Sequence, residues 1–459
     1  MKHINERVVR LNDHEINENA KYVLYWMQIF KRTTHNHSLT YAIRRSNELA
    51  LPLVVYEGLK YNYPWANDRL HTFILEGVEE KRKAFAYLGI KYVFYLQKDK
   101  HSPKQTVAKL AECAALIVTD DYPCFIIPGH NETIASKANI PVFAVDSNCI
   151  IPLAKFKKEE YAAYTIRPKI NKLIDNYLRP YVEESVNIAA KNIDLDCSDT
   201  VVTTDNIAKL VAECDIDHDV KPSKKYKGGT IAAKERLDLF IKNILPDYDK
   251  TRSKPDRDGS SRLSSYLHFG FISPLEIALA VTDAKASEDA KDAYLEELIV
   301  RRDLSFNFTR HNKTYDSLGS LPDWVHNTMR EHAADERQVV YSLEDMESAN
   351  THDELWNAAQ REMVATGEMH NYVRMLWGKN VIAWTKSYEE AFAILEHLNN
   401  KYCLDGRDPN SYAGILWCFG KHDRPWMERP VFGMIRYMTS GNTGKKFDSK
   451  EYIRWTKTL

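Results

Sequence analysis

Three tryptophans stand close together in the stretch LWNAAQREMVATGEMHNYVRMLWGKNVIAW, residues 355–384. Indole can lose one electron, and neighbouring rings can pass the resulting charge along a line. Trp377 and Trp384 are seven residues apart, so a helix places them on one face, about 10 Å apart along its axis. Trp356 precedes Gly367 and is expected on the preceding helix, packed against that face. The stretch allows two interpretations, a redox relay and a hydrophobic core, and does not decide between them.

Small hydroxyl residues form a second candidate in GSSRLSSYLHFGFIS, residues 259–273. Ser260, Ser261 and Ser264 come just before a helical pattern. Exposed amides and hydroxyls at the start of a helix suit a phosphate or a pyrophosphate. A plain helix cap uses the same residue types, so both interpretations stay open.

A dense polar turn with the sequence DGRDPN occupies residues 405–410. Turn formation alone explains the Asp, Gly, Pro and Asn residues. Its carboxylates are also suited to pair with a helical arginine such as Arg374. An arginine–carboxylate pair of this kind beside a cofactor is the functional interpretation.

Basic and aromatic side chains alternate near the end of the chain, over residues 420–446. The acids in this segment are Asp423 and Glu428, against six Lys or Arg residues, with Trp426, Phe432 and Tyr437 between them. Such a mixture suits a nucleic-acid strand, through phosphate contacts and base stacking. A solvated surface is the alternative. The basic residues are Lys421, Arg424, Arg429, Arg436, Lys445 and Lys446.

Composition sets limits on the class of protein. The chain has 459 residues and a formal net charge of −1, so a nucleic-acid partner must meet a local basic patch and not the whole surface. Its 7 cysteines contain no CxxC pair, which argues against a zinc site or a disulfide framework and favours a reducing compartment. No apolar run approaches 18 residues and no signal peptide is evident. We therefore expect a cytoplasmic monomer without a membrane contact or a metal, nuclear if the source has a nucleus.

The first third of the chain alternates short apolar runs with helical patterns. Helices are expected over residues 69–89 and 102–115. This alternation predicts a parallel sheet covered by helices, with ligands beyond the carboxyl ends of its strands. The chain has no GxGxxG or Walker A motif, so ordinary dinucleotide or triphosphate binding there is not supported. Buried strands are expected at residues 22–27, 51–59, 90–96, 115–121 and 140–146.

The strand pattern fades after residue 152. Residues 183–229 are polar, first acidic and then basic, which is typical of a connection between domains. Helical periodicity then dominates to the end. We predict an α/β domain with a Rossmann-like parallel sheet over residues 20–152, an interdomain linker over 153–228, and an all-helical domain over 229–459.

Four separated motifs, in this order, resemble the photolyase/cryptochrome family, and class II cyclobutane pyrimidine dimer photolyases in particular. They are SSRLSSYLHFG, EELIVRRDLSFNF, THDELWNAAQREMVATGEMHNYVRMLW and LNNKYCLDGRDPNSYAGILW; EEYAAYTIRPKI and KHDRPWMER are similar too. The resemblance implies an antenna-type α/β domain joined to a helical domain that binds FAD. It implies that reduced FAD, when excited by light, gives an electron to a pyrimidine dimer flipped out of double-stranded DNA, whose cyclobutane ring then splits.

The resemblance also implies a set of flavin contacts. Arg374 matches the arginine beside the isoalloxazine ring, paired with Asp405, and Asn399 matches the asparagine that faces the reactive flavin nitrogen. Gly406, Asp408 and Asn410 belong to the same flavin-binding turn. The residues that match contacts to the FAD phosphates and ribityl chain are Tyr248, Ser260, Ser261, Arg262, Leu263 and Ser264.

Lesion contacts and the relay follow from the same resemblance. Glu297 matches the acid that hydrogen-bonds the dimer, and Met375 and Trp417 match the apolar lining of the lesion pocket. Arg436 matches the arginine that enters the gap left by the flipped bases. From the basic segment itself, we expect phosphate contacts at Lys421, Arg424 and Arg429. The resemblance places the relay, from the flavin outward, at Trp377, Trp356 and Trp384.

Some positions depart from the family pattern. Phe306 stands where relatives often have Asp, and Leu376 replaces a tyrosine next to the relay. The segment MQIFKRTTHNHSL also departs from the usual pattern near the first strand, which leaves open the antenna chromophore, a deazaflavin in the family's usual case. Two rival functions are a cryptochrome-like photoreceptor and a helical nucleic-acid-binding module whose indoles are only core.

Overall fold

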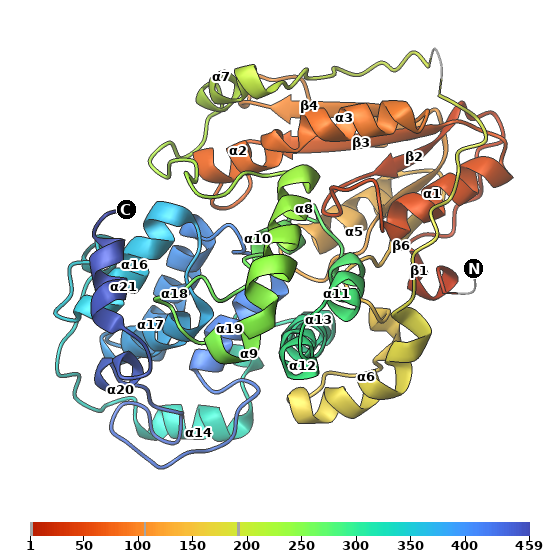
Figure 1. Cartoon of the computed structure of the whole chain (residues 1–459). Helices are drawn as coiled ribbons and strands as arrows, with labels where there is room; N and C mark the ends of the chain where they lie inside the picture. Colours follow the sequence, from red (N-terminus) through yellow and green to blue (C-terminus); the bar gives the residue numbers. More distant parts are fainter. Residues whose placement is uncertain (1–2, 105–106, 191–192) are drawn as a thin grey trace.

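A six-stranded sheet forms the centre of the N-terminal domain. In the computed structural model, its strands are arranged in the order β1-β6-β5-β2-β3-β4, and all neighbours are parallel except β1 and β6 (Figure 1). The strands are β1 (Val8–Arg10), β2 (Tyr22–Trp26), β3 (Leu53–Lys60), β4 (Lys91–Gln97), β5 (Ala114–Asp120) and β6 (Val142–Val145). All five expected strands are confirmed. β1 was missed because three half-exposed residues carry no apolar run.

The structure describes residues 3–104, 107–190 and 193–459. Within these ranges, no helix has the length and apolar character needed to cross a membrane. Residues 105–106, inside the helix expected at 102–115, and residues 191–192, inside the expected linker, lie outside the described residues.

Helices cover both faces of the sheet. The helix expected over residues 69–89 is two helices, α2 (Asp68–Glu76) and α3 (Val78–Tyr87), which meet at Gly77. A Cβ at Gly77 would lie 2.5 Å from the Phe271 ring, so the helical domain approaches the chain closely at this break. The others are α1 (His37–Glu48), α4 (Val107–Ala111) and α5 (Ile127–Lys137).

The segment expected to be a linker contains helices of its own. α6 (Ala163–Tyr177) buries Ile166 and Ile170, and α7 (Ile207–Ala212) packs against α2. Between them the chain runs past the outer edge of the sheet, where Thr200 N–H donates to the carbonyl of Phe94 in β4, 2.6 Å away (Figure 1). Packing of these apolar faces makes the linker part of the folded body.

The rest of the chain is helical, as expected. α8 (Thr230–Leu239) through α13 (Arg302–His311) lie between the sheet and the C-terminal helices (Figure 1). The tryptophan-rich core is built by α16 (Glu354–Thr366), α17 (Asn371–Ala383), α18 (Tyr388–Tyr402) and α19 (Pro409–Cys418). The other helices in this part are η4 (Phe240–Ile244), η5 (Leu245–Asp247), α9 (Tyr248–Thr251), α10 (Ser264–His268), α11 (Pro274–Asp283), α12 (Glu288–Leu295), η6 (Glu296–Arg301), η7 (Leu318–Ser320), α14 (Asp323–Glu331), α15 (Leu343–Glu347), α20 (Ser440–Gly444) and α21 (Ser449–Thr456).

One buried arginine joins the two domains. Arg69, on α2, donates to the carbonyl oxygens of Tyr402 at 2.8 Å, Val364 at 2.6 Å and Met363 at 3.3 Å. These carbonyls lie in the last turns of α16 and α18; Met363 O also accepts Gly367 N–H at 3.0 Å, while Val364 and Tyr402 lie where the helix runs out of backbone donors. A cation also suits the negative end of each helix dipole. Arg69 therefore fixes two helices of the tryptophan core against the α/β domain.

Candidate functional site

A cavity of about 730 Å³ opens among α9, α10, η6, α17, α18 and α19. Most residues that the sequence suggested for flavin binding meet at its wall, although they come from segments as much as 160 residues apart. The suggested residues that line it are Tyr248, Ser260, Ser261, Arg262, Leu263, Ser264, Glu297, Arg374, Met375, Trp377, Asn399, Asp405, Asp408 and Asn410. The suggested residues outside its lining are Trp356, Trp384, Gly406, Trp417, Lys421, Arg424, Arg429 and Arg436.

The expected ion pair between Arg374 and Asp405 is formed. Arg374 Nη2 lies 3.2 Å from Asp405 Oδ1, and it also donates to the carbonyl of Met369 at 3.3 Å. Burial would lower the pKa of Arg374, but the Asp405 carboxylate outweighs it and raises that pKa. Arg374 Nε is buried without a hydrogen-bond partner among the described residues. The cavity wall thus carries one permanent cation with a donor still to be satisfied.

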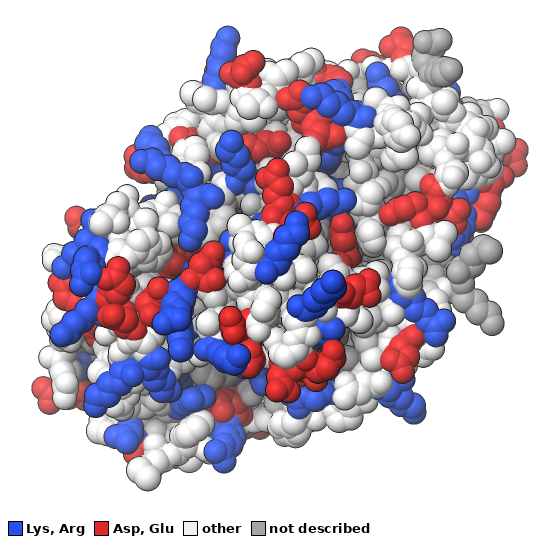
Figure 2. Space-filling view, viewed as in Figure 1, with Lys and Arg blue, Asp and Glu red and all other residues white. Residues whose placement is uncertain are grey.

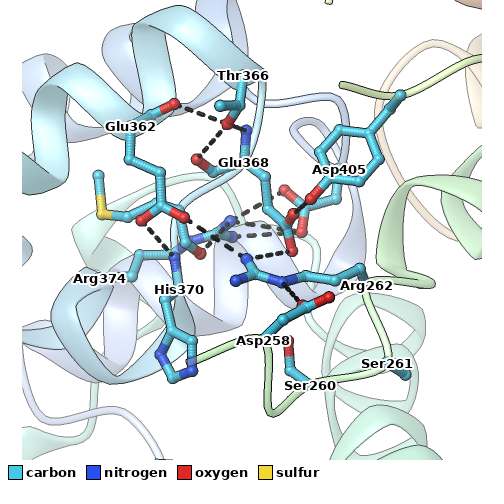
Figure 3. A network of polar contacts seen from close by, with 12 residues as sticks. Asp258, Ser260, Ser261, Arg262, Glu362, Thr366, Glu368, His370, Arg374 and Asp405 are labelled. Atoms are coloured by element: carbon cyan, nitrogen blue, oxygen red, sulfur yellow. Dashed lines mark hydrogen bonds and ion pairs between the residues drawn. The ribbon is translucent and has the colours of Figure 1, made fainter. Parts of the chain in front are cut away.

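Arg262 lies in a cluster of carboxylates that the sequence did not reveal (Figure 3). Its side chain is 4% exposed and lies 3.1 Å from Glu368, 3.3 Å from Asp258 and 3.5 Å from Glu362. Its backbone is left-handed, with φ 56°, which turns the chain into α10. Because this guanidinium is held by the protein's own acids, it fixes the part of the cavity wall that it lines.

The two glutamates respond differently to Arg262. Burial would raise the pKa of Glu368, but the charge of Arg262 and a hydrogen bond from the Tyr226 hydroxyl outweigh it and lower that pKa. Burial dominates at Glu362 and raises its pKa, although Tyr452 donates to it at 2.6 Å. Glu362 lies in the last turn of α16 and Glu368 lies just beyond its C-cap, where the helix dipole disfavours an anion. Arg262 supplies the cation that offsets this effect at both acids.

The polar turn at residues 405–410 is stabilised from the α/β domain. The Tyr122 hydroxyl, just after β5, donates to Asp408 Oδ2 at 2.8 Å, and Asp408 Oδ1 caps α19 by accepting from Asn410 N–H at 2.8 Å. Burial would raise the pKa of Asp408, but hydrogen bonds from His268 and Asn410 outweigh it and lower it to about 2. At Gly406 a Cβ would lie 2.9 Å from the Asn399 carbonyl, so glycine lets the turn lie against α18. Gly406 therefore shapes the wall from outside the lining.

The three tryptophans form one line that starts at the cavity. Trp377 lines the cavity, its ring stacks on Trp356 with centroids 6.3 Å apart, and Trp356 meets Trp384 at 5.6 Å. The indole N–H groups donate to neutral acceptors: Trp377 to Gln360 Oε1 at 2.9 Å and Trp356 to the Trp377 carbonyl at 3.0 Å. The exposed fractions are 2%, 0% and 7% along the line. The rings are both core and continuous, in the order that the family resemblance implies.

Glu297 stands at the cavity wall on the π-helical segment η6. Its Oε1 accepts from Arg252 Nη1 at 2.6 Å, and both side chains are partly exposed. Arg252 also lines the cavity and was missed by the sequence analysis. Its position one turn after Tyr248 was the available signal.

Cations and tryptophans alternate beyond the cavity, in the segment after α19. The guanidinium of Arg436 lies 5.6 Å from the centre of the Trp417 ring, at the end of α19, and 4.8 Å from that of Trp426. The guanidinium of Arg424 lies 5.0 Å from the centre of the Trp426 ring. Arg424 and Arg429 are exposed. In the sequence, Trp426 was noted only as one of the interleaved aromatic residues, yet Arg424 and Arg436 both lie over its ring. Figure 2 shows Lys and Arg side chains gathered at the lower left, over α20 and the loop beside it.

Lys421 does not belong to this surface, which corrects its expected role. Its ammonium is buried, 2.6 Å from Glu159 and 2.7 Å from the carbonyl of Ser320. A phosphate contact would have to break this ion pair and draw the ammonium out of its buried position. Lys421 instead joins the residues before α6 to the segment after α19.

Comparison with known proteins identifies relatives of this chain. The family model "DNA photolyase" matches residues 23–186. The chain is 39% identical to the deoxyribodipyrimidine photo-lyase of Methanothermobacter thermautotrophicus over 98% of this chain and 97% of that protein. It is 37% identical to the deoxyribodipyrimidine photo-lyase of Arabidopsis thaliana over 95% of this chain and 89% of that one.

Among solved structures, the fold is similar to that of a cryptochrome from Synechocystis sp. PCC6803. The TM-score is 0.71, at 17% identity, over 94% of this chain and 88% of that chain. This likeness shows a shared fold, and the near full-length sequence identities show shared descent. The chain belongs to the photolyase/cryptochrome family.

Proposed function

We propose that this protein is a light-driven DNA repair enzyme of the photolyase type that binds FAD and splits cyclobutane pyrimidine dimers, as class II photolyases do. One observation carries the proposal: a single cavity places the Arg374–Asp405 pair, Trp377 and Glu297 together. A cofactor anchor, an electron supply and a polar contact for a substrate then meet at one place. The names of the curated relatives support this reaction.

The residues of the cavity suit FAD. Arg374 Nε and His370 Nε2 are buried without hydrogen-bond partners among the described residues, and both residues line the cavity. The start of α10, with Ser260, Ser261 and Ser264, offers amides and hydroxyls to the phosphates. Bound and reduced, FAD would supply a light-absorbing electron donor. Arg374 would hold the ring system, and Asn399, 2% exposed on α18, would present its carboxamide to it.

The substrate side of the cavity would take a flipped dimer. The carboxyl group of Glu297 would hydrogen-bond the pyrimidine, and Arg252 would fix the orientation of Glu297. Met375 at the wall and Trp417, on α19 outside the lining, would give apolar contacts. Flipping costs a few kcal/mol, less for a damaged base. Arg436, stacked between two indoles, is placed to fill the gap in the duplex, and Arg424 and Arg429 are placed to hold phosphates.

An antenna chromophore has no part in this proposal. At the carboxyl ends of β2 and β5, Gln28 Nε2 donates to Thr119 at 2.8 Å and to Asn131 at 2.9 Å, and Trp26 stacks on His130. Ligands of such sheets bind at this edge. Here the chain's own side chains satisfy one another, so no deazaflavin contact is assigned.

The proposal is tested by flavin release and by repair. Heating the purified protein should release one FAD per chain. The chemically reduced protein should restore dimer-containing duplex DNA under blue or near-ultraviolet light, and not in the dark. A folded protein that takes up no FAD would contradict the proposal. A flavoprotein that never repairs would leave a cryptochrome-like photoreceptor as the function.

Replacement of Arg436 by alanine is expected to weaken binding to damaged duplex by about tenfold, equivalent to about 1.4 kcal/mol. The loss should be smaller for undamaged duplex and for single-stranded damaged DNA, because only a duplex with flipped bases has a gap to fill. Arg429→Ala is the matched control, because loss of a phosphate contact should weaken both duplexes alike and reduce the salt slope by about one unit. Titrations at two salt concentrations measure both effects. An equal loss of affinity for all three DNA substrates in Arg436→Ala would show that Arg436 acts only as an electrostatic contact.

A further inference from the structure

The tryptophan line ends at a ring that solvent barely reaches. Trp384 is 7% exposed, so a reductant in solution has little of the indole to touch. Tyr341, in the segment before α15, lies directly against it. The two ring centroids are 5.6 Å apart at 76°, and Tyr341 N–H donates to the carbonyl of Trp384 at 3.0 Å. Backbone and side chain together hold the phenol beside the last indole.

The Tyr341 hydroxyl is paired with a base. It lies 2.8 Å from His352 Nδ1, and its oxygen also accepts His352 N–H at 2.9 Å. The oxygen already accepts the backbone N–H, so its own proton is free to point at Nδ1 in the tautomer that carries the single imidazole proton on Nε2. The imidazole is in ring contact with both neighbours, 5.9 Å from Tyr341 and 5.1 Å from Trp384. His352 is exposed, so a proton that reaches it can leave to water.

We propose that Tyr341 is the terminal electron donor of the tryptophan line and that His352 accepts its proton. This rests on the proposed function, in which light-driven reduction of FAD leaves one electron missing from the tryptophans. Trp384 then takes one electron from Tyr341. The O–H bond breaks, an N–H bond forms at His352 Nδ1, and a neutral tyrosyl radical and an imidazolium remain. A soluble thiol returns one hydrogen atom to Tyr341, and His352 releases its proton to water.

The environment of the three rings supports this order. A phenol that loses an electron becomes a strong acid, so the electron leaves readily only when a base takes the proton, and His352 lies within hydrogen-bond distance. Trp377 and Trp356 donate to an amide and a carbonyl oxygen, which are not bases that would keep their protons. Charge can therefore pass through the indoles and stop at Tyr341. The proton transfer to His352 then opposes the return of the charge from Tyr341 to the flavin.

Transient absorption after a light flash tests the proposal in the flavin-loaded protein. In the wild type, a tyrosyl signal should grow as the tryptophanyl signal decays, and deuterated water should slow that step. Tyr341→Phe keeps the ring contact but should lose the tyrosyl signal and lower the yield of photoreduction. His352→Leu should slow tyrosyl formation by about tenfold, equivalent to about 1.4 kcal/mol of barrier. Tyr87→Phe, which changes a ring 92% exposed on α3, is the matched control and should behave as the wild type.

A second measurement needs no flavin. The flavin-free chain is illuminated with a soluble one-electron photo-oxidant and a spin trap, and the adducts are located by mass spectrometry. The wild type should carry the adduct at Tyr341, and His352→Leu should carry less. A tyrosyl signal that survives in Tyr341→Phe, or adducts at other tyrosines only, would overturn the electron step. An unchanged rate in His352→Leu would overturn the proton step. Absence of photoreduction in the wild type would count against the proposed function instead, while the spin-trap result still decides the role of Tyr341.

Discussion

Replacement of Trp377 by phenylalanine is expected to abolish photoreduction of the oxidised flavin and to leave repair by chemically reduced protein largely intact. Trp377 is the member of the line that borders the cavity, while Trp356 and Trp384 lie behind it. Phenylalanine fills a similar space but is far harder to oxidise than indole. We expect a loss of about 100-fold or more, equivalent to about 2.7 kcal/mol of barrier. Repair uses an electron that the flavin already holds, so it does not need the line.

The assay follows the flavin absorbance under steady light, and repair is measured separately after chemical reduction. Trp455→Phe is the matched control, because Trp455 lies on α21 and its ring contacts Tyr452 and not the line. Trp377→Phe also leaves Gln360 Oε1 without its indole donor, at a cost of about 1–3 kcal/mol. Its thermal unfolding must therefore be compared with that of the wild type. If photoreduction persists in a folded Trp377→Phe protein, the three indoles serve only in packing.

Replacement of Arg262 by methionine is expected to destabilise the protein by about 3–5 kcal/mol, because it leaves buried carboxylates without their cation. Glu362 and Glu368 both lie within 3.5 Å of this guanidinium (Figure 3). The wall that carries the start of α10 should loosen, so FAD should be lost as well. Arg82→Met is the control, since its partner Asp199 is partly exposed and such pairs contribute about 0–1 kcal/mol.

The pH dependence of stability should reverse in this variant. In the wild type, Arg262 lowers the pKa of Glu368 against burial, so the pair stabilises the fold above the ordinary glutamate pKa and this stability is lost as pH falls. Without Arg262, burial raises the pKa of Glu368 against only the Tyr226 hydrogen bond and the charge of Lys225, and Glu362 loses its cation as well, so stability should be lost as pH rises. Denaturant unfolding at about pH 5 and about pH 8 measures the difference. Adding Glu368→Gln should restore part of the loss; if it restores none, the carboxylate cluster is not the cause.

Local patterns in the sequence were sufficient to predict the α/β domain and the helical domain. Apolar runs such as residues 51–59 are long and buried on both faces, so periodicity alone identified β3 and its parallel neighbours. The helical domain followed in the same way. The motifs around Arg262, Arg374 and Asp405 identified the cavity wall, because a cofactor needs particular residue types at fixed spacing. The short strand β1 and the helix α6 were missed, since the first has only three residues and the second lies in a segment expected to be a linker.

Contacts between distant segments were decided by the tertiary structure. Lys421 reads as a surface cation in the sequence, and only the approach of Glu159 from 262 residues away shows that it is buried. In the sequence, Glu362 and Glu368 look like ordinary acids near a helix end, and only the tertiary structure places Arg262 within 3.5 Å of both. The sequence by itself determined which side chains are present and which helices and strands carry them, because these depend on interactions within a few residues. Which charge is neutralised, and which ring follows Trp384, depends on packing between elements, and local periodicity does not record that packing.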